Sequence, residues 1–96
     1  PELGPTRVTL AVHPNPFNPR ATVAFALHQQ AHVNLEVFDV SGRRVAMLAV
    51  GEFAAGNHTV TWEGRDQRGR AQSSGTYLMR LTAGTTTLTE KVVLVR

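Results

Sequence analysis

The sequence predicts an all-β fold, a single immunoglobulin-like antiparallel β-sandwich of about seven strands. Short segments alternate apolar and polar residues with a period of two, which is the signature of strands with one buried face. Turn signals rich in glycine, proline, asparagine and serine separate these segments at regular intervals. No helical periodicity extends far enough to predict a helix. Ninety-six residues is the length of one domain with one core.

The domain is expected to span residues 6–96. Residues 1–5 contain two prolines and a glycine without periodicity, so we interpret them as a linker from an upstream domain. The sequence begins with Pro1 rather than methionine, which suggests a segment of a longer protein.

Strands are expected where inward-facing residues recur at every second position. In chain order these are Val8, Leu10, Val12, Val23, Phe25, Leu27, Val33, Leu35, Val37, His58, Val60, Trp62, Tyr77, Met79, Leu81, Leu88, Val92 and Leu94. The fourth strand, residues 44–50, is less clearly patterned, and we place it at a sheet edge. We expect residues 51–56 to form a loop and residues 64–70 to form a fully solvated connection. No internal repeat is expected.

A proline-rich bend follows the first strand. Three prolines between Pro14 and Pro19 exclude a helix or a central strand, because proline lacks the amide donor and restricts the preceding residue. The bend is expected to be ordered, with Phe17 buried as its anchor.

The end of the sequence is expected to form a closing β-hairpin that turns at Gly84. Its last strand holds the β-branched run from Val92 to Val95 and is followed by one cation, Arg96. We expect the sequence to end within this strand. Such an ending suggests that another molecule recognises it, either by pairing with an unpaired backbone edge or by capturing a carboxylate.

The positive charge of the chain comes almost entirely from arginine. The formal net charge is +3, and Lys91 is the single lysine among ten basic residues. Two sequence clusters, Arg43-Arg44 and Arg65, Arg68 and Arg70, allow a local anion-attracting patch, although a solvated surface is the favoured interpretation. Aromatic residues are only 6% of the chain and do not interleave with the cations, so we expect no nucleic-acid partner.

Two further features of the composition are the absence of cysteine and the absence of a long apolar segment. The chain has no cysteine, so neither a disulfide nor a thiolate metal site can stabilise the fold, while the cellular compartment stays open. No apolar run approaches the length of a transmembrane segment, and no signal peptide is visible.

We expect no metal site, cofactor or enzymatic activity. His28 and His32 are four residues apart, but that spacing converges two imidazoles only on a helix. The acidic residues show no calcium-loop pattern, and Asp66 is expected to cap a turn. The serines, Ser41, Ser73 and Ser74, lie outside any nucleophile-elbow motif.

Trp62 has two interpretations. A lone tryptophan on a β-sandwich can form a platform on which a sugar ring stacks. Its parity with Val60 and His58 favours the core instead.

Several short motifs occur in a specific order along the chain. They are Pro14-Asn15-Pro16-Phe17-Asn18-Pro19, Val37-Phe38-Asp39-Val40-Ser41-Gly42-Arg43-Arg44-Val45, Gly56-Asn57-His58, Trp62-Glu63-Gly64-Arg65-Asp66, Gly69-Arg70, Ser74-Gly75-Thr76-Tyr77 and Lys91-Val92-Val93-Leu94. In this order they resemble the type A C-terminal sorting domain of type IX secretion cargo, the Por secretion tail. The signature is shared with immunoglobulin-like domains related to that of the flagellar hook-capping protein. The resemblance extends from about Val8 to Arg96.

This resemblance implies a module that directs an upstream passenger through the periplasm and across the outer membrane, for surface display or release. The implied partners are the secretion machinery and a sortase-like peptidase. The family motifs fall on Pro14, Asn15 and Pro16, and on Asp39, Gly42 and Arg43. The expected sorting residues are Gly75, Tyr77, Lys91, Val92, Val93, Leu94, Val95 and Arg96. The alternatives are a non-catalytic accessory or spacer domain that stabilises a neighbouring secreted enzyme and, less favoured, a carbohydrate-binding module.

Overall fold

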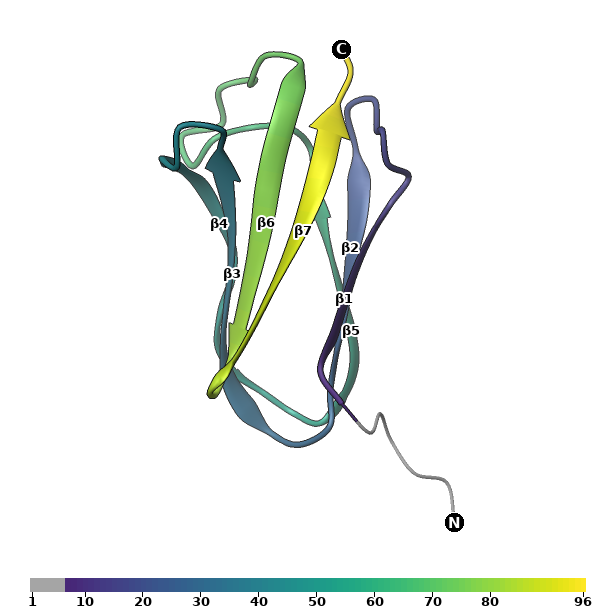
Figure 1. Ribbon diagram of the computed structural model, residues 1–96, viewed down its shortest axis with the longest axis vertical. Helices are drawn as coiled ribbons and strands as arrows, with labels where there is room; N and C mark the ends of the chain where they lie inside the picture. The colour runs from purple at the N-terminus through teal and green to yellow at the C-terminus, as the bar shows by residue number, and fades with distance from the viewer. Residues whose placement is uncertain (1–6) are drawn as a thin grey trace.

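The computed structural model describes residues 7–96, which form two antiparallel sheets packed face to face (Figure 1). The expected linker, residues 1–5, lies outside the described residues. The strands are β1 (Thr9–His13), β2 (Ala21–Leu27), β3 (Ala31–Asp39), β4 (Arg44–Phe53), β5 (Gly56–Trp62), β6 (Gly75–Ala83) and β7 (Thr86–Leu94). One sheet has the order β1-β2-β5 and the other the order β4-β3-β6-β7. The predicted seven-stranded, all-β sandwich is confirmed.

The two sheets enclose one core that follows the predicted alternation. The largest fully buried side chains are Phe17, Phe25, Leu27, Leu35, Met79, Leu81, Leu94, Val23, Val33, Val37 and Val92. Some predicted inward residues on β1, β5 and β7 are only half-buried, such as Leu10, Val60 and Leu88. These three strands are sheet edges, so a neighbouring strand covers them from one side only. Residues 7–96 contain no helix long and apolar enough to cross a membrane.

Strand β4 lies at a sheet edge as predicted, but it is longer than expected. It continues to Phe53 and pairs with β3, so the prediction of a loop at residues 51–56 is wrong. Two register shifts interrupt its pairing with β3. A shift of one residue changes which side chains face the core, and consecutive residues Val45 and Ala46 are therefore both buried. This irregularity explains the unclear alternation in the sequence.

Trp62 lies in the core at one end of the sandwich. Its side chain is 2% exposed, and its ring centroid is 5.5 Å from that of Phe17 and 5.3 Å from that of Tyr77. The indole nitrogen donates a hydrogen bond to the carbonyl of Arg65 at 2.9 Å, so the polar atom is satisfied. The core assignment of Trp62 and the burial of Phe17 are confirmed, and Trp62 cannot serve as a sugar platform.

Candidate functional site

The last six residues, Lys91–Arg96, are here called the tail, and Asn15 binds their backbone directly. The side-chain amide of Asn15 donates to the carbonyl of Lys91 at 2.9 Å and accepts from the amide of Val93 at 3.0 Å. Phe17 continues the pairing, because its amide donates to the Val93 carbonyl at 2.9 Å and its carbonyl accepts from Val95 at 2.8 Å. An asparagine side chain carries both a donor and an acceptor, so it can replace one peptide unit of a neighbouring strand. The proline-rich bend thus pairs with the tail in the parallel sense.

This pairing overturns one expectation about the tail. The outward-directed backbone groups of Lys91, Val93 and Val95 that carry these bonds are already satisfied, so capture through an unpaired edge between Lys91 and Val95 is wrong for the folded domain. Strand β7 also ends at Leu94, so the sequence does not end within the strand. Beyond Leu94, Val95 bonds to Phe17 of the bend rather than continuing the pairing with β6.

The side chains of the tail form an inner and an outer row. Val92 and Leu94 are 0% and 1% exposed and complete the core, whereas Lys91 and Val95 are exposed and Val93 is half-buried. We call Lys91, Val93 and Val95 the outer row. Alternation along β7 places Lys91 and Val93 on the outer face of the four-stranded sheet, and Val95 follows directly after the strand with its side chain exposed. A partner of the folded domain can contact the outer row but not the inner one.

The two predicted sorting residues on β6 support the inner row of the tail. Gly75 pairs with Leu94, and Tyr77 pairs with Val92. Tyr77 is 5% exposed, and its hydroxyl donates a hydrogen bond to the carbonyl of Ser73 at 2.7 Å. This resembles the tyrosine corner of immunoglobulin-like sandwiches, in which a tyrosine near the start of a strand bonds to backbone a few residues upstream.

Arg96 joins the tail to the connection between β5 and β6. Its amide donates to the hydroxyl of Ser74 at 2.9 Å, and its guanidinium donates to the carbonyls of Gln72 and Gly64. Gly64 has φ of 70°, and a Cβ there would lie 2.8 Å from Arg96 Nη2 and 3.2 Å from Leu94 Cδ2. Glycine at this position therefore allows both the backbone conformation and the close approach of the tail.

The family motif Asp39-Val40-Ser41-Gly42-Arg43 forms a tight loop between β3 and β4. Oδ1 of Asp39 accepts hydrogen bonds from the amides of Ser41 and Arg43, both at 3.0 Å. The Asp39 amide donates to the Arg43 carbonyl at 2.9 Å, and Gly42 has φ of 89°. Glycine accepts this left-handed conformation at little cost, so Asp39 and Gly42 together fix the loop.

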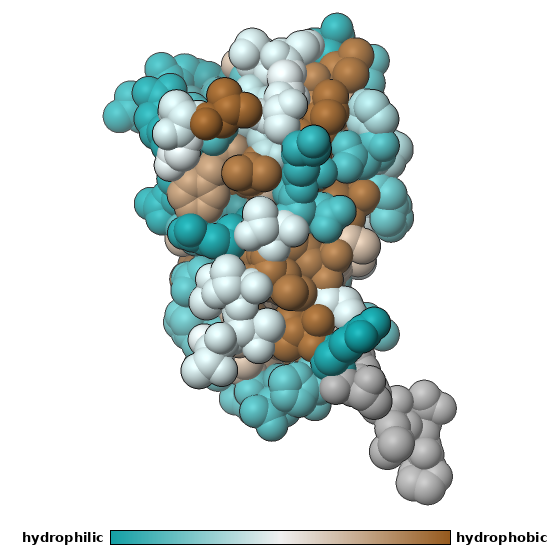
Figure 2. Space-filling view, in the orientation of Figure 1, coloured by the Kyte–Doolittle hydropathy of each residue, from teal (hydrophilic) through white to brown (hydrophobic). Residues whose placement is uncertain are grey.

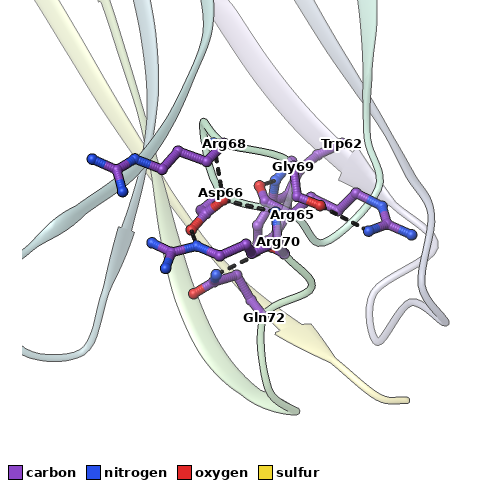
Figure 3. Close-up of polar contacts among 7 residues, drawn as sticks. All are labelled: Trp62, Arg65, Asp66, Arg68, Gly69, Arg70 and Gln72. Carbon is purple, nitrogen blue, oxygen red and sulfur yellow. Dashed lines mark hydrogen bonds and ion pairs between the residues drawn. The ribbon is translucent and has the colours of Figure 1, made fainter.

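A second loop, Asp66-Gln67-Arg68-Gly69-Arg70, repeats this geometry (Figure 3). Oδ1 of Asp66 accepts from the amides of Arg68 at 2.9 Å and Arg70 at 2.8 Å. The Asp66 amide donates to the Arg70 carbonyl at 2.8 Å, and Gly69 has φ of 83°. We call residues 39–43 and 66–70 the twin loops. The spacing Asp-x-x-Gly-Arg thus occurs twice in the chain and forms the same kind of loop each time, a recurrence that the sequence analysis did not identify.

The connection at residues 64–70 is exposed at most positions, but it is not fully solvated as expected. The amide of Gln67 donates to the Val45 carbonyl at 3.1 Å, and Oε1 of Gln67 accepts from the Met47 amide at 2.7 Å. These bonds attach the loop to the edge strand β4, and Gly64 before it is buried. The prediction that Asp66 caps a turn is confirmed.

Both aspartates of the twin loops are held in their charged form. The hydrogen bond from the Ser41 hydroxyl, at 2.6 Å, and that from the Arg43 amide lower the pKa of Asp39. The hydrogen bond from the Arg70 amide is the largest influence that lowers the pKa of Asp66, and the Arg70 side chain acts in the same direction. Hydrogen bonds to a carboxylate favour its ionised form, so both loops are built around a negative charge at neutral pH.

A cleft of about 590 Å³ lies beside the twin loops. Its basic lining residues are Arg43, Arg44, Arg68 and Arg70, and we call it the arginine cleft. Figure 3 shows the guanidinium groups of Arg68 and Arg70 on the same side of the second loop. Arg65 turns to the opposite side and donates to the Gly69 carbonyl at 2.9 Å. The fold thus brings together four of the five arginines whose sequence clusters allowed an anion-attracting patch.

Histidines do not supply a metal centre in the part of the chain that the structure describes. No three histidine, cysteine, aspartate or glutamate side chains converge there in a way that could hold an ion. His32 Nδ1 lies 3.6 Å from Glu52 across the β3 and β4 pair, and His58 packs against the rings of Phe25 and Phe53.

Two packed antiparallel sheets, a buried tryptophan and a tyrosine bonded to upstream backbone define an immunoglobulin-like β-sandwich domain. The FlgD Ig-like domain matches residues 16–87, most of the chain. The chain therefore belongs to the FlgD Ig-like domain family.

Curated relatives match part of the chain. It is 39% identical over 51 residues to the basal-body rod modification protein FlgD of Salmonella typhimurium, and equally to that of Salmonella typhi. The match covers 53% of this chain and 22% of each FlgD protein, so the aligned segment spans about a fifth of these relatives.

Three solved structures share the fold. Dimeric latent PorU from Porphyromonas gingivalis has a TM-score of 0.78 at 22% identity, covering 92% of this chain and 9% of PorU. PorZ, described as an essential bacterial surface component of the type IX secretion system of the same organism, has a TM-score of 0.61 at 21% identity, covering 91% of this chain and 11% of PorZ. FlgD of Pseudomonas aeruginosa has a TM-score of 0.62 at 24% identity, covering 98% and 77%.

Proposed function

We propose that the chain is the sorting module of a larger exported protein. In this proposal an outer-membrane translocation machinery recognises the module and moves the attached passenger from the periplasm to the cell surface or the medium. The ordered motifs, the membership of the FlgD Ig-like domain family and the fold shared with PorU and PorZ support it. The module has no enzymatic role or cofactor, and a sortase-like peptidase acts on it after transport.

The observation that carries the proposal is the fixed presentation of the tail. Asn15 and Phe17 hold the backbone, Val92 and Leu94 anchor the inner row, and Arg96 is bonded to the β5 to β6 connection. A rigid strand that presents one cation and two valines loses little conformational entropy when a partner binds it. The receptor would therefore recognise the outer row rather than the backbone edge.

The test is whether the chain is sufficient for export. A reporter directed to the periplasm of a type IX-secreting bacterium is fused to residues 1–96, and the reporter is then measured in periplasm, outer surface and medium. We expect the fused reporter to leave the periplasm in the wild-type host and to stay there when the translocation machinery is deleted. A fused reporter that stays in the wild-type periplasm, although the domain is folded, contradicts the proposal.

Deletion of the whole tail is a poor test of recognition. It would remove Val92 and Leu94 from the core, together with the bonds that Asn15 and Arg96 make. Loss of export would then follow from unfolding alone. Substitutions confined to the outer row avoid this ambiguity.

The match to the basal-body rod modification protein favours one alternative, a structural accessory or spacer domain. In that case removal of the chain lowers the thermal unfolding midpoint of its neighbour and leaves the neighbour's location unchanged. The location measurement separates the two functions. The carbohydrate-binding alternative loses its main candidate residue, because Trp62 is buried.

A further inference from the structure

We propose that the arginine cleft binds the phosphate group of a small phosphorylated ligand, such as a sugar phosphate. This inference does not depend on the sorting function. It rests on the twin loops, which place arginines from two separate parts of the sequence around one cavity.

The two loops hold their backbones rigidly while leaving guanidinium donors available. Arg68 uses its amide to bind Asp66, and its side chain has no hydrogen-bond or ion-pair partner within residues 7–96. Arg43 lies 3.6 Å from Asp39, and its side chain is 82% exposed, so this ion pair is loose. Each loop thus contributes at least one guanidinium able to bind a ligand.

The remaining charges of the cleft are more tightly engaged. Arg70 pairs with Asp66 at 2.9 Å, and Arg44 pairs with Glu36 at 3.2 Å. Both oxygens of Asp66 already accept hydrogen bonds from its own loop. Because a guanidinium has five N–H donors, Arg70 and Arg44 retain donors after these pairs form.

A phosphate fits this arrangement better than a carboxylate does. Guanidinium groups bind anionic oxygens through parallel pairs of hydrogen bonds, and a carboxylate has only two oxygens for them. The three terminal oxygens of a phosphate monoester offer acceptors for more than one of the arginines that line the cleft. The lining contains no aromatic residue on which a nucleobase could stack, which favours a sugar over a nucleoside as the remainder of the ligand.

The cleft has room for more than the phosphate. Its volume of about 590 Å³ is within the usual range of small-molecule sites, and Gln72 provides a polar group beside the arginines. The phosphate supplies the attraction, and the rest of the ligand occupies the open part of the cleft.

The test is an NMR titration of the chain, following backbone amide shifts, with glucose 1-phosphate, inorganic phosphate and glucose as probes. One variant carries Arg43→Gln and Arg68→Gln, which remove one guanidinium from each loop and keep both aspartates; Arg43→Gln also removes the loose ion pair with Asp39. The matched control carries Arg7→Gln and Arg20→Gln, which remove the same charge outside the cleft lining; within residues 7–96, Arg20 forms one exposed ion pair, with Glu63 at 3.5 Å.

We expect glucose 1-phosphate to shift the amides of both twin loops saturably and glucose to have no effect. The cleft variant should bind at least about tenfold more weakly, whereas the control should bind almost as well as wild type. Equal affinity for inorganic phosphate would identify the phosphate alone as the recognised group, and tighter binding of glucose 1-phosphate would identify the sugar phosphate. Absence of saturable shifts in the twin loops, or equal weakening in both variants, would overturn the proposal.

Discussion

At the scale of single residues, polar side chains fix the backbone around the tail and the twin loops. Asn15 is the clearest example, because it contacts residues 76 and 78 positions away in the sequence. The family motif singled out Asn15, but its hydrogen-bond partners could not be predicted from local patterns, because they lie far away in the sequence.

Replacing Asn15 with alanine should destabilise the domain. The change leaves the Lys91 carbonyl and the Val93 amide without their partner, and we expect a loss of about 1–3 kcal/mol in the free energy of unfolding. Denaturant titration measures it. Asn18→Ala is the control, since Asn18 is exposed in the same bend and has no side-chain hydrogen bond within residues 7–96. Similar losses for both variants would show that Asn15 does not hold the tail.

The aspartates of the twin loops predict a specific dependence of stability on pH. The folded state lowers the pKa of Asp66 below its ordinary value of 3.8. The stabilisation that ionised Asp66 gives the folded state is therefore complete above that pH and is lost as pH falls through the lower folded pKa. Asp66→Asn should therefore be less stable than wild type at neutral pH, with the difference shrinking below pH about 4. Asp39→Asn should behave in the same way. If wild type and the asparagine variant differ by the same free energy of unfolding at neutral and at acidic pH, this account is refuted.

At the scale of elements, uninterrupted alternation made β2, β3 and β6 predictable. Strand β4 was only partly predictable, because its register shifts bury consecutive residues. The second twin loop could have been found from its spacing, whereas its attachment to β4 through Gln67 depends on contacts distant in sequence.

The close packing of the tail against the β5 to β6 connection can be tested at Gly64. Gly64 and Gly69 both have a left-handed backbone conformation that strains alanine. A Cβ added at Gly64 would lie against Arg96 and Leu94, whereas a Cβ added at Gly69 would have no atom within 4 Å. Backbone strain should lower the free energy of unfolding of each alanine variant by about 1–2 kcal/mol, and Gly64→Ala should lower it further because the tail must move. Thermal or denaturant unfolding compares them. A Gly69→Ala variant that is equally or more destabilised would contradict the proposed packing.

At the scale of the whole molecule, the bend and the tail join the two sheets. The chain leaves β1 of the three-stranded sheet, and Asn15 and Phe17 pair with the end of β7 in the other sheet (Figure 1). Figure 2 shows apolar side chains gathered in a band beside β7 on this face, with polar side chains on either side. The tail therefore completes the core with one row of side chains and presents the other outward.

The most direct test of this account is the export of a reporter fused to a chain with an altered outer row. Lys91→Ser, Val93→Thr and Val95→Thr keep the strand propensity of the valine positions and leave Val92 and Leu94 in the core. Val50→Thr and Glu52→Ser, on the distant edge strand β4, form the control, because Val50 is 59% exposed. Thermal unfolding first establishes that both variants are folded.

We then measure the fraction of reporter that leaves the periplasm. The account predicts that the outer-row variant exports at least about tenfold less reporter than wild type, because a few central contacts dominate recognition, while the β4 control exports normally. Export of the folded outer-row variant at the wild-type level would contradict the claim that the tail is recognised through these side chains.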